Sequence, residues 1–158
     1  MVKLFKLPFR ENIIKGDSYE MPCRTLVLHG AGKSDRTRFT RMRQALQQKK
    51  IPSLSFDFIG HGETGGELLG GTLRSRTEQV IAIIDAYCQE PLTLIAASMS
   101  AYTAVRLTEV FSVRNLILLV PAFYTFTAYD TPFGPFFSEV IRAPFSWRES
   151  DAFQILER

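Results

Sequence analysis

The chain has 158 residues, enough to bury the core of one domain. Hydrophobic residues make up 46% and charged residues 22%, an ordinary balance for a soluble globular protein. The formal net charge of +3 is small and the basic residues are scattered, which argues against a nucleic-acid-binding protein. Two cysteines, Cys23 and Cys88, define no disulfide framework and fit a reducing compartment, so we expect a cytoplasmic protein.

The N-terminal segment does not read as a targeting sequence. Its first ten residues, MVKLFKLPFR, interrupt their apolar positions with Lys3, Lys6 and Pro8, unlike the continuous apolar stretch of a signal peptide. Elsewhere no apolar run approaches the roughly 20 residues needed to cross a bilayer. We therefore expect no membrane span. The sequence also contains no internal repeat and no low-complexity linker.

The chain opens with a predicted β-hairpin followed by a buried strand. Residues 2–20 alternate loosely between polar and apolar types, and Gly16-Asp17 is a turn signal within them. Residues 25–28, TLVL, form a short apolar run typical of a buried strand. This strand runs directly into the tight glycine-containing loop His29-Gly30-Ala31-Gly32.

A helix and a second buried strand are predicted next. The helix covers residues 37–49, with Phe39, Met42 and Leu46 on its inner face and Arg38, Arg41 and Arg43 on its outer face. The strand covers residues 54–58. Residues 60–66 follow it and are too rich in glycine for regular structure.

The same alternation continues to residue 120. The predicted elements are a helix over residues 72–90, ended by Pro91, a strand over 92–96, a helix over 101–107 and a strand over 115–120. The inner face of the first of these helices would carry Val80, Ile84, Tyr87 and Cys88.

Strands that alternate with helices and are apolar throughout predict an α/β fold, with a mostly parallel sheet and helices on both faces. Right-handed crossovers place the loops that follow parallel strands at one edge of the sheet, where such folds hold their sites. We therefore expect residues 29–31, residues 57–62 and Ser98 to converge there.

The turn between residues 96 and 100 is the strongest functional signal. A strand becomes a helix there through Ala96-Ala97-Ser98-Met99-Ser100, a variant of the G-x-S-x-G nucleophile elbow. The residues two before and two after the serine are pressed together at so tight a bend, so only small side chains fit. The alternative is an ordinary strand-to-helix connection in which Ser98 caps the helix.

Three segments of the chain resemble the α/β-hydrolase superfamily, in the order and at the spacing found in that family. LVLHGAG resembles the family's loop after its strand, DFIGHGETGG resembles a D-x-x-G-H-G-x-S stretch, and LIAASMSA is similar to the elbow. The resemblance covers residues 25–122 and therefore only the N-terminal portion of such a protein. It implies a serine hydrolase of the esterase type that cleaves an ester or related acyl compound, without a cofactor or a metal.

The resemblance also assigns roles to individual positions. Ser98 would be the nucleophile, and the backbone N–H groups of Ala31 and Met99 would form the oxyanion hole. The remaining matched residues would hold the loops in place and would not act as the base; they are His29, Gly30, Asp57 and His61.

The sequence departs from the family where the catalytic triad should be completed. A serine nucleophile needs a histidine base, and that histidine needs a carboxylate. No histidine follows Ser98. Asp130 follows the last predicted strand and could be the acid, but it lies in a loop rich in Thr, Pro and Gly that is unsuited to the role. The acid and the base are therefore absent from this chain, and we expect it to be the front part of a longer protein.

Residues 123–158 differ in composition from the rest. They hold seven of the thirteen phenylalanines and Trp147. We expect residues 1–122 to form the hydrolase core and residues 123–158 an incomplete cap or lid that shapes a pocket for an apolar acyl substrate. The alternative is that these aromatic residues cover the sheet edge at residues 115–120, which would otherwise stay open. A homodimer through that edge or through the aromatic tail is a further option.

Two other functions fit parts of the sequence. Gly32-Lys33-Ser34 and Asp57 resemble parts of a P-loop nucleotide site, but the first glycine of that motif is replaced by Val27, inside the strand. A non-catalytic binding module with a hydrolase fold would explain the missing base. The elbow serine favours the enzyme, provided that the chain is part of a longer protein.

Overall fold

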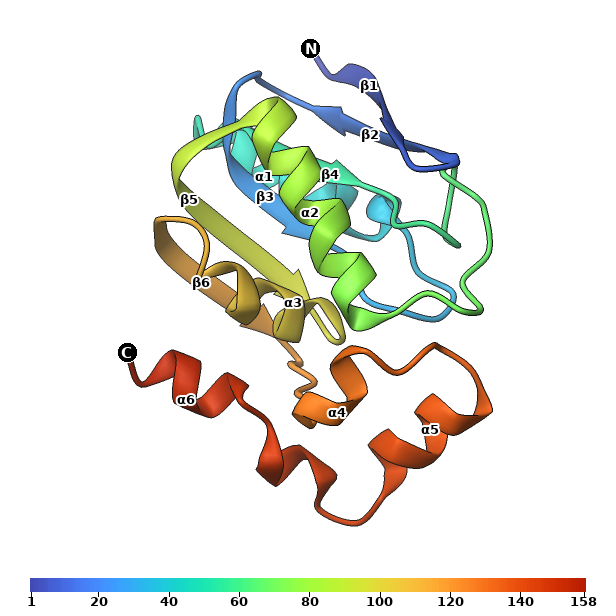
Figure 1. Ribbon diagram of the computed structural model, residues 1–158. Coiled ribbons are helices and arrows are strands. Elements are labelled where there is room, and N and C mark those ends of the chain that lie inside the picture. The colour runs from blue at the N-terminus through green and yellow to red at the C-terminus, as the bar shows by residue number, and fades with distance from the viewer.

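The computed structural model describes residues 1–158, which form one six-stranded sheet with helices on both faces (Figure 1). The strands are β1 (Lys3–Phe9), β2 (Asn12–Ser18), β3 (Cys23–Leu28), β4 (Ser53–Phe56), β5 (Cys88–Ala97) and β6 (Val113–Leu119). Their order across the sheet is β1-β2-β4-β3-β5-β6. Strand β2 pairs antiparallel with both β1 and β4, whereas β4, β3, β5 and β6 run parallel to one another. The predicted fold class is confirmed.

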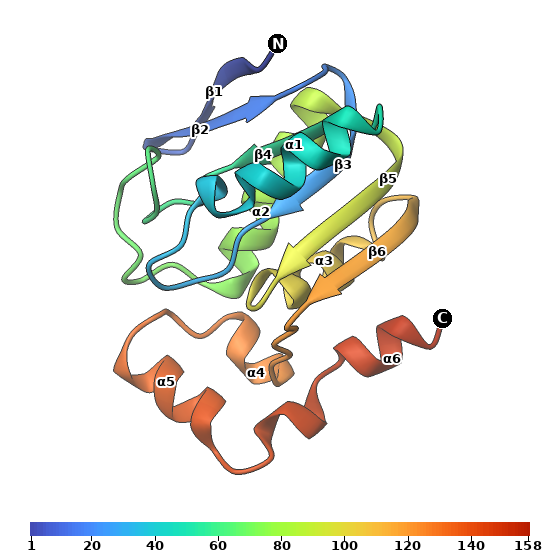
Figure 2. The ribbon, with the colours of Figure 1, turned by 180° about the vertical axis from the view of Figure 1, so that it is seen from behind.

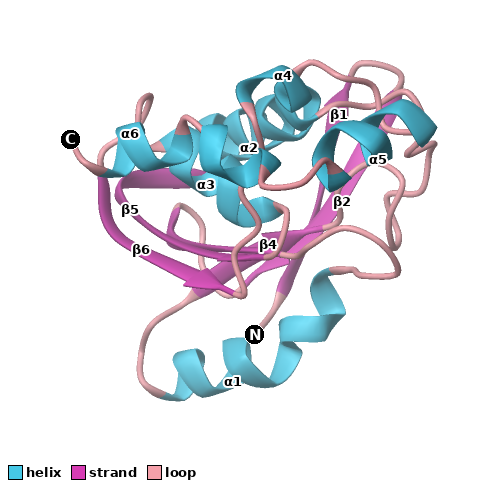
Figure 3. Ribbon diagram, turned by 90° about the horizontal axis from the view of Figure 1, so that it is seen from below, coloured by secondary structure: helices cyan, strands magenta, loops and turns pink.

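Helices lie on both faces of the sheet and beyond the carboxyl ends of its strands (Figure 1). They are η1 (Arg36–Phe39), α1 (Thr40–Gln48), α2 (Leu73–Tyr87), α3 (Ser100–Leu107), α4 (Phe126–Tyr129), α5 (Pro135–Arg142), η2 (Ser146–Glu149) and α6 (Ala152–Leu156). Helix α1 covers one face of the sheet, as the view from behind shows (Figure 2). Helices α2 and α3 cover the other face, and α6 packs on α3 (Figure 3). No helix is long and apolar enough to cross a membrane.

Helix α2 illustrates how the sequence specifies an element. Thr72 caps its N-terminus, because the Thr72 hydroxyl accepts a hydrogen bond from the Ser75 N–H and the Ser75 hydroxyl accepts one from the Thr72 N–H. Val80, Ile83 and Ile84 recur at helical spacing and are buried against the sheet. Burying each such side chain contributes about 1.5–3 kcal/mol.

The core has two parts. The larger lies between α2, α3 and the sheet, and its most buried members include Leu26, Leu54, Phe56, Ile83 and Leu94. The smaller joins α2 and α3 to residues 123–158, called the tail from here on. Its members include Met99, Tyr102, Tyr129, Phe133 and Phe137.

The predicted hairpin is confirmed, but its turn is not at Gly16-Asp17. The strands reverse at Arg10-Glu11, and Gly16 lies inside β2, opposite Phe5 of β1. A Cβ atom at Gly16 would collide with the Phe5 ring and lie 2.5 Å from the Ser55 carbonyl oxygen. Gly16 is therefore required for close packing between strands and not for a turn.

The predicted helix over residues 37–49 begins with the 3₁₀ turn η1, and one of its side chains faces the opposite way. Arg43 was expected outside but is buried. Its guanidinium donates hydrogen bonds to the carbonyl oxygens of Ser53 and Asp17 and pairs with the Asp17 carboxylate at 2.7 Å. These acceptors at the end of β2 and the start of β4 compensate the buried charge.

The helix predicted over residues 72–90 ends three residues early. Cys88 starts β5 and pairs with Cys23 of β3, so Pro91 lies inside the strand and does not end the helix. Tyr87 and Cys88, expected on the inner face of the helix, are only partly buried. Pairing with β3 extends β5 beyond the range that the apolar run indicated.

We expect Gly16→Ala to lower the free energy of unfolding by about 1–3 kcal/mol, because the added methyl group overpacks the space between Phe5 and β4. Lys6→Ala, an exposed change on the strand β1, is the matched control and should have little effect. Chemical denaturation of the two variants and the wild type measures this. Equal stability of Gly16→Ala and Lys6→Ala would contradict it.

Candidate active site

Strand β5 and helix α3 meet in a turn of only two residues, Ser98 and Met99. Ser98 has a φ angle of +51°, in the left-handed region that costs a non-glycine residue about 1–2 kcal/mol. Ala96 and Ser100, on either side, are fully buried, so larger side chains would not fit at the bend. The turn has the tight geometry that the sequence predicted.

Hydrogen bonds from the next strand hold the Ser98 backbone in this conformation. The Ser98 N–H donates to the Leu119 carbonyl oxygen at 3.0 Å, and the Ser98 carbonyl oxygen accepts from the N–H groups of Ala101 and Ala122 at 3.0 and 3.2 Å. The side chain is partly exposed, and its hydroxyl makes no hydrogen bond within the chain. The backbone is therefore fixed while the hydroxyl stays available.

The loop after β3 lies directly against this turn. A Cβ atom at Gly30 would lie 3.1 Å from the Ser98 Cβ and 3.7 Å from the Ser98 Oγ. The Ser100 hydroxyl donates a 2.5 Å hydrogen bond to the carbonyl oxygen of His29. The predicted convergence of residues 29–31 with Ser98 at one edge of the sheet is therefore present.

The backbone N–H groups of Ala31 and Met99 are not used within the chain. Neither donates a hydrogen bond to any backbone or side-chain acceptor. Met99 directly precedes α3, whose N-terminus carries a partial positive charge. Both N–H groups are therefore without an acceptor in this structure.

The two histidines of the chain are engaged with backbone groups. The Phe58 N–H donates to His29 Nε2 at 3.2 Å, which leaves Nδ1 to donate to the Gly30 carbonyl oxygen at 2.6 Å. His61 Nδ1 lies 3.0 Å from the Ser34 carbonyl oxygen. Neither ring forms a hydrogen bond with Ser98.

Burial keeps both imidazoles neutral. It lowers the pKa of His29 to about 3, and the nearby Arg76 charge acts in the same direction. Burial and Arg76 also lower the pKa of His61. His29 lies edge-on to both Phe58 and His61.

Asp57 is a buried carboxylate whose oxygens are already occupied. It accepts hydrogen bonds from the N–H groups of Arg36 and Glu63, at 2.7 and 3.0 Å, and it pairs with the Arg36 guanidinium. Arg36 also pairs with Asp17 and Glu63. These contacts join η1, β2 and the residue 57–63 loop.

The features that suggested a nucleotide site do not form one. Gly32 and Lys33 are exposed, the helix after them begins as the 3₁₀ turn η1, and the carboxylate of Asp57 is bound to Arg36. No group of three or more His, Cys, Asp and Glu side chains is arranged to hold a metal ion. This arrangement argues against a phosphate loop with a bound magnesium ion.

Asp130 lies on the surface and pairs with Arg74 of α2, whose Nη2 donates to Asp130 Oδ2 at 2.8 Å. That hydrogen bond lowers the pKa of Asp130. Its carboxylate is engaged with α2 and makes no contact with either histidine.

The tail lies beyond the carboxyl ends of β5 and β6, next to the turn at Ser98 (Figure 1). Tyr102 of α3 anchors it, since its hydroxyl donates a 2.6 Å hydrogen bond to Asp151. The tail aromatics Tyr129, Phe133 and Phe137 share a cluster with Met99, and Ala31 packs against it. Strand β6 pairs only with β5, so the tail does not supply a strand to the sheet edge.

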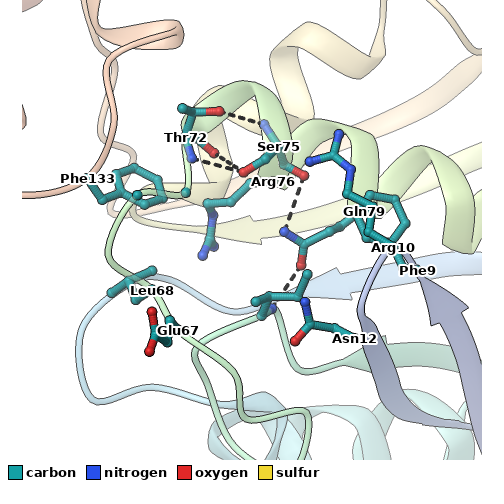
Figure 4. A pocket seen from close by; sticks show the side chains of 13 residues that line it. Phe9, Arg10, Asn12, Glu67, Leu68, Thr72, Ser75, Arg76, Gln79 and Phe133 are labelled. Atoms are coloured by element: carbon teal, nitrogen blue, oxygen red, sulfur yellow. Dashed lines mark hydrogen bonds between the residues drawn. The ribbon is translucent and has the colours of Figure 1, made fainter.

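A cleft of about 280 Å³ opens beside the first turns of α2 (Figure 4). Leu68 and Phe133 lie at one end of it, and Arg76 and Gln79 project from the helix. Ser98 is not among the residues that line this cleft.

Besides Arg43, the sequence analysis missed two buried arginines, Arg36 and Arg76. A signal for Arg76 exists, because it falls on the helical stripe of Leu73, Val80 and Ile84 that faces the core. Arg36 carries no such signal, since it lies in a loop and its partners come from three different segments.

No protein-family model and no curated protein sequence matches this chain. Solved structures do match in fold. The thioesterase domain from the curacin biosynthetic pathway is 21% identical, with a TM-score of 0.70, over 79% of this chain and 48% of that chain.

Two further structures agree. A bottromycin epimerase in complex with bottromycin A2 is 23% identical, with a TM-score of 0.65, over 78% of this chain and 50% of that chain. An α/β hydrolase from Penicillium sp. sh18 is 13% identical, with a TM-score of 0.66, over 79% and 47%. The chain spans about half the length of the structures it matches.

The neutral state of His29 predicts a pH dependence of stability. Its folded pKa of about 3 lies below the ordinary unfolded value of about 6.5, so the unfolded state binds more protons between these values. Stability should therefore fall as the pH falls below 6.5. The expected loss relative to His29→Gln is about 1.6 kcal/mol between pH 6.5 and pH 5.

Urea denaturation of the wild type and His29→Gln across this pH range tests the prediction. Since all carboxylates are shared by the two proteins, the difference between their pH slopes isolates the histidine. Parallel slopes would show that His29 is not held neutral.

Proposed function

We propose that this chain, which has about half of an α/β-hydrolase fold, is the nucleophile-bearing part of a serine hydrolase that cleaves esters or related acyl compounds. The observation that carries the proposal is the Ser98 turn. A left-handed φ angle at a two-residue connection is a costly conformation for serine, and its hydroxyl is left free and partly exposed. An ordinary helix cap needs neither feature.

The chemistry follows from the groups around Ser98. Its Oγ would attack the acyl carbonyl carbon, and the carbonyl oxygen would take up the negative charge. The unused N–H groups of Ala31 and Met99 would donate to that oxygen. Losing one such donor typically costs about 10²–10³ in rate.

The base would come from outside residues 1–158. His29 and His61 form hydrogen bonds with backbone groups, their pKa values are lowered, and neither forms a hydrogen bond with Ser98. The proposal therefore places the acid and the histidine in the half of the fold that this chain does not span.

Residues 123–158 would act as a cap over the site. Their aromatic side chains belong to the buried cluster that contains Met99 and against which Ala31 packs, and these are the two residues proposed to form the oxyanion hole. An apolar lining at this position favours an acyl group or a similar hydrophobic substrate.

A binding module without catalysis is the second candidate. It is favoured by the engagement of both histidines, which leaves Ser98 without an activating base in this chain. The similarity to a bottromycin epimerase is a reminder that a fold of this kind does not fix one reaction.

We expect Ser98→Ala to abolish ester hydrolysis by the complete protein, because no other group supplies the attacking oxygen. Hydrolysis of p-nitrophenyl butyrate measures this, and circular dichroism checks the fold. Ser112→Ala is the matched control, since Ser112 is an exposed serine at the opposite end of β6. A Ser98→Ala variant with wild-type turnover would disprove the assignment.

We expect residues 1–158 alone to hydrolyse the same ester at little or no measurable rate, because they supply the nucleophile without a base. The assay compares this chain with its own Ser98→Ala variant. Robust turnover that depends on Ser98 would mean that a base exists within the chain.

A further inference from the structure

Arg76 is a buried cation without a counter-ion. Its side chain is 2% exposed, and no Asp or Glu side chain pairs with it. Arg36, the other deeply placed arginine near the loops, pairs with three carboxylates. Burying a charge unpaired costs several kcal/mol, so a core position on α2 would ordinarily hold an apolar residue.

The contacts of Arg76 are all with neutral groups. Its Nη2 donates to the Ser100 hydroxyl at 2.8 Å and to the His29 carbonyl oxygen at 3.2 Å. The guanidinium carbon lies 3.7 Å from the centroid of the Phe58 ring. Nε and Nη1 have no partner. These contacts satisfy some donors and leave the positive charge uncancelled.

The same contacts join the two segments proposed to form the oxyanion hole. His29 lies two residues before Ala31, and Ser100 directly follows Met99. Because the Ser100 hydroxyl also donates to the His29 carbonyl oxygen at 2.5 Å, Arg76, Ser100 and His29 form a closed triangle of hydrogen bonds. The triangle fixes one segment relative to the other.

We propose that Arg76 is a positioning residue for acyl transfer, which holds the oxyanion-hole segments together through Ser100 and His29 and places an uncancelled positive charge behind them. The inference rests on the proposed function of Ser98. Ser100 occupies the last position of the elbow motif, where the family pattern has glycine. Its hydroxyl supplies the acceptor that couples the elbow to Arg76.

Neighbouring groups do not neutralise this charge. Both nearby histidines are kept neutral, in part by Arg76 itself, and Asp57 is bound to Arg36. Burial lowers the pKa of Arg76 to about 9, so the guanidinium remains protonated at neutral pH. The negative charge that develops on the substrate oxygen would be its counter-ion during the reaction.

The test uses the complete protein, p-nitrophenyl butyrate as substrate and phenylboronic acid as a tetrahedral analogue that binds the active serine. Arg76→Met keeps the length of the side chain and removes the charge and the donors. We expect kcat to fall about 10- to 100-fold with KM changed less than threefold, and the inhibition constant of the boronic acid to rise in proportion to the loss of kcat.

Arg76→Lys keeps the positive charge and one donor nitrogen in place of the guanidinium, and should recover part of the lost kcat. Ser100→Gly restores the family residue but removes the acceptor, and should lower kcat in the same direction. Arg41→Met is the control, an exposed arginine of α1 on the other face of the sheet, and should leave kcat unchanged.

Wild-type kcat in Arg76→Met would overturn the proposal, as would a loss of kcat without any change in boronic acid affinity. If Arg76→Met does not fold, Arg76→Lys and Ser100→Gly decide, and wild-type kinetics in both would overturn it. Full activity in Ser98→Ala would disprove the proposed function, and the role of Arg76 with it. Loss of activity in Ser98→Ala together with wild-type kinetics in the Arg76 variants would disprove only the role of Arg76.

Discussion

The close approach of two backbone segments, residues 29–31 and 97–100, is the constraint on which the rest of this structure depends. Hydrogen bonds with Leu119, Ala122 and Ala101 hold the Ser98 backbone in its left-handed conformation. Gly30 lies so close to Ser98 that an added Cβ would be only 3.1 Å from the Ser98 Cβ. The order of β3, β5 and β6 in the sheet brings these segments to one edge, so the topology serves the turn directly.

Buried polar groups hold the surrounding loops, and they do so in two electrostatically different ways. Around Arg36, three carboxylates compensate the charge, and the result is a rigid junction between η1, β2 and the loop after β4. Around Arg76, the partners are a hydroxyl, a carbonyl oxygen and an aromatic ring. The first arrangement compensates the buried charge locally, whereas the second leaves the positive charge of Arg76 without a counter-ion.

The sheet has an unpaired edge at β6, as expected if this chain spans only about half of the matched folds. Its antiparallel side ends in the hairpin β1–β2, while β6 at the other side has one unpaired edge and exposes Ile117. The aligned part of this chain covers only about half of each matched structure. The tail packs on α3 and at the carboxyl ends of the strands, so it adds aromatic surface near Ser98 and leaves the edge of β6 unpaired.

The sequence by itself determined the alternation of strands and helices, the parallel sheet and the tight turn at Ser98, because apolar periodicity and small-residue spacing are local signals. Only the tertiary structure decided the role of Gly16, the burial of Arg43 and the end of α2, since each depends on a neighbouring strand. The same holds for the Arg76 triangle, whose members are 24, 47 and 71 residues apart in pairs. A hydrogen bond between residues far apart in sequence produces no periodic pattern of residue types, so the sequence alone does not reveal it.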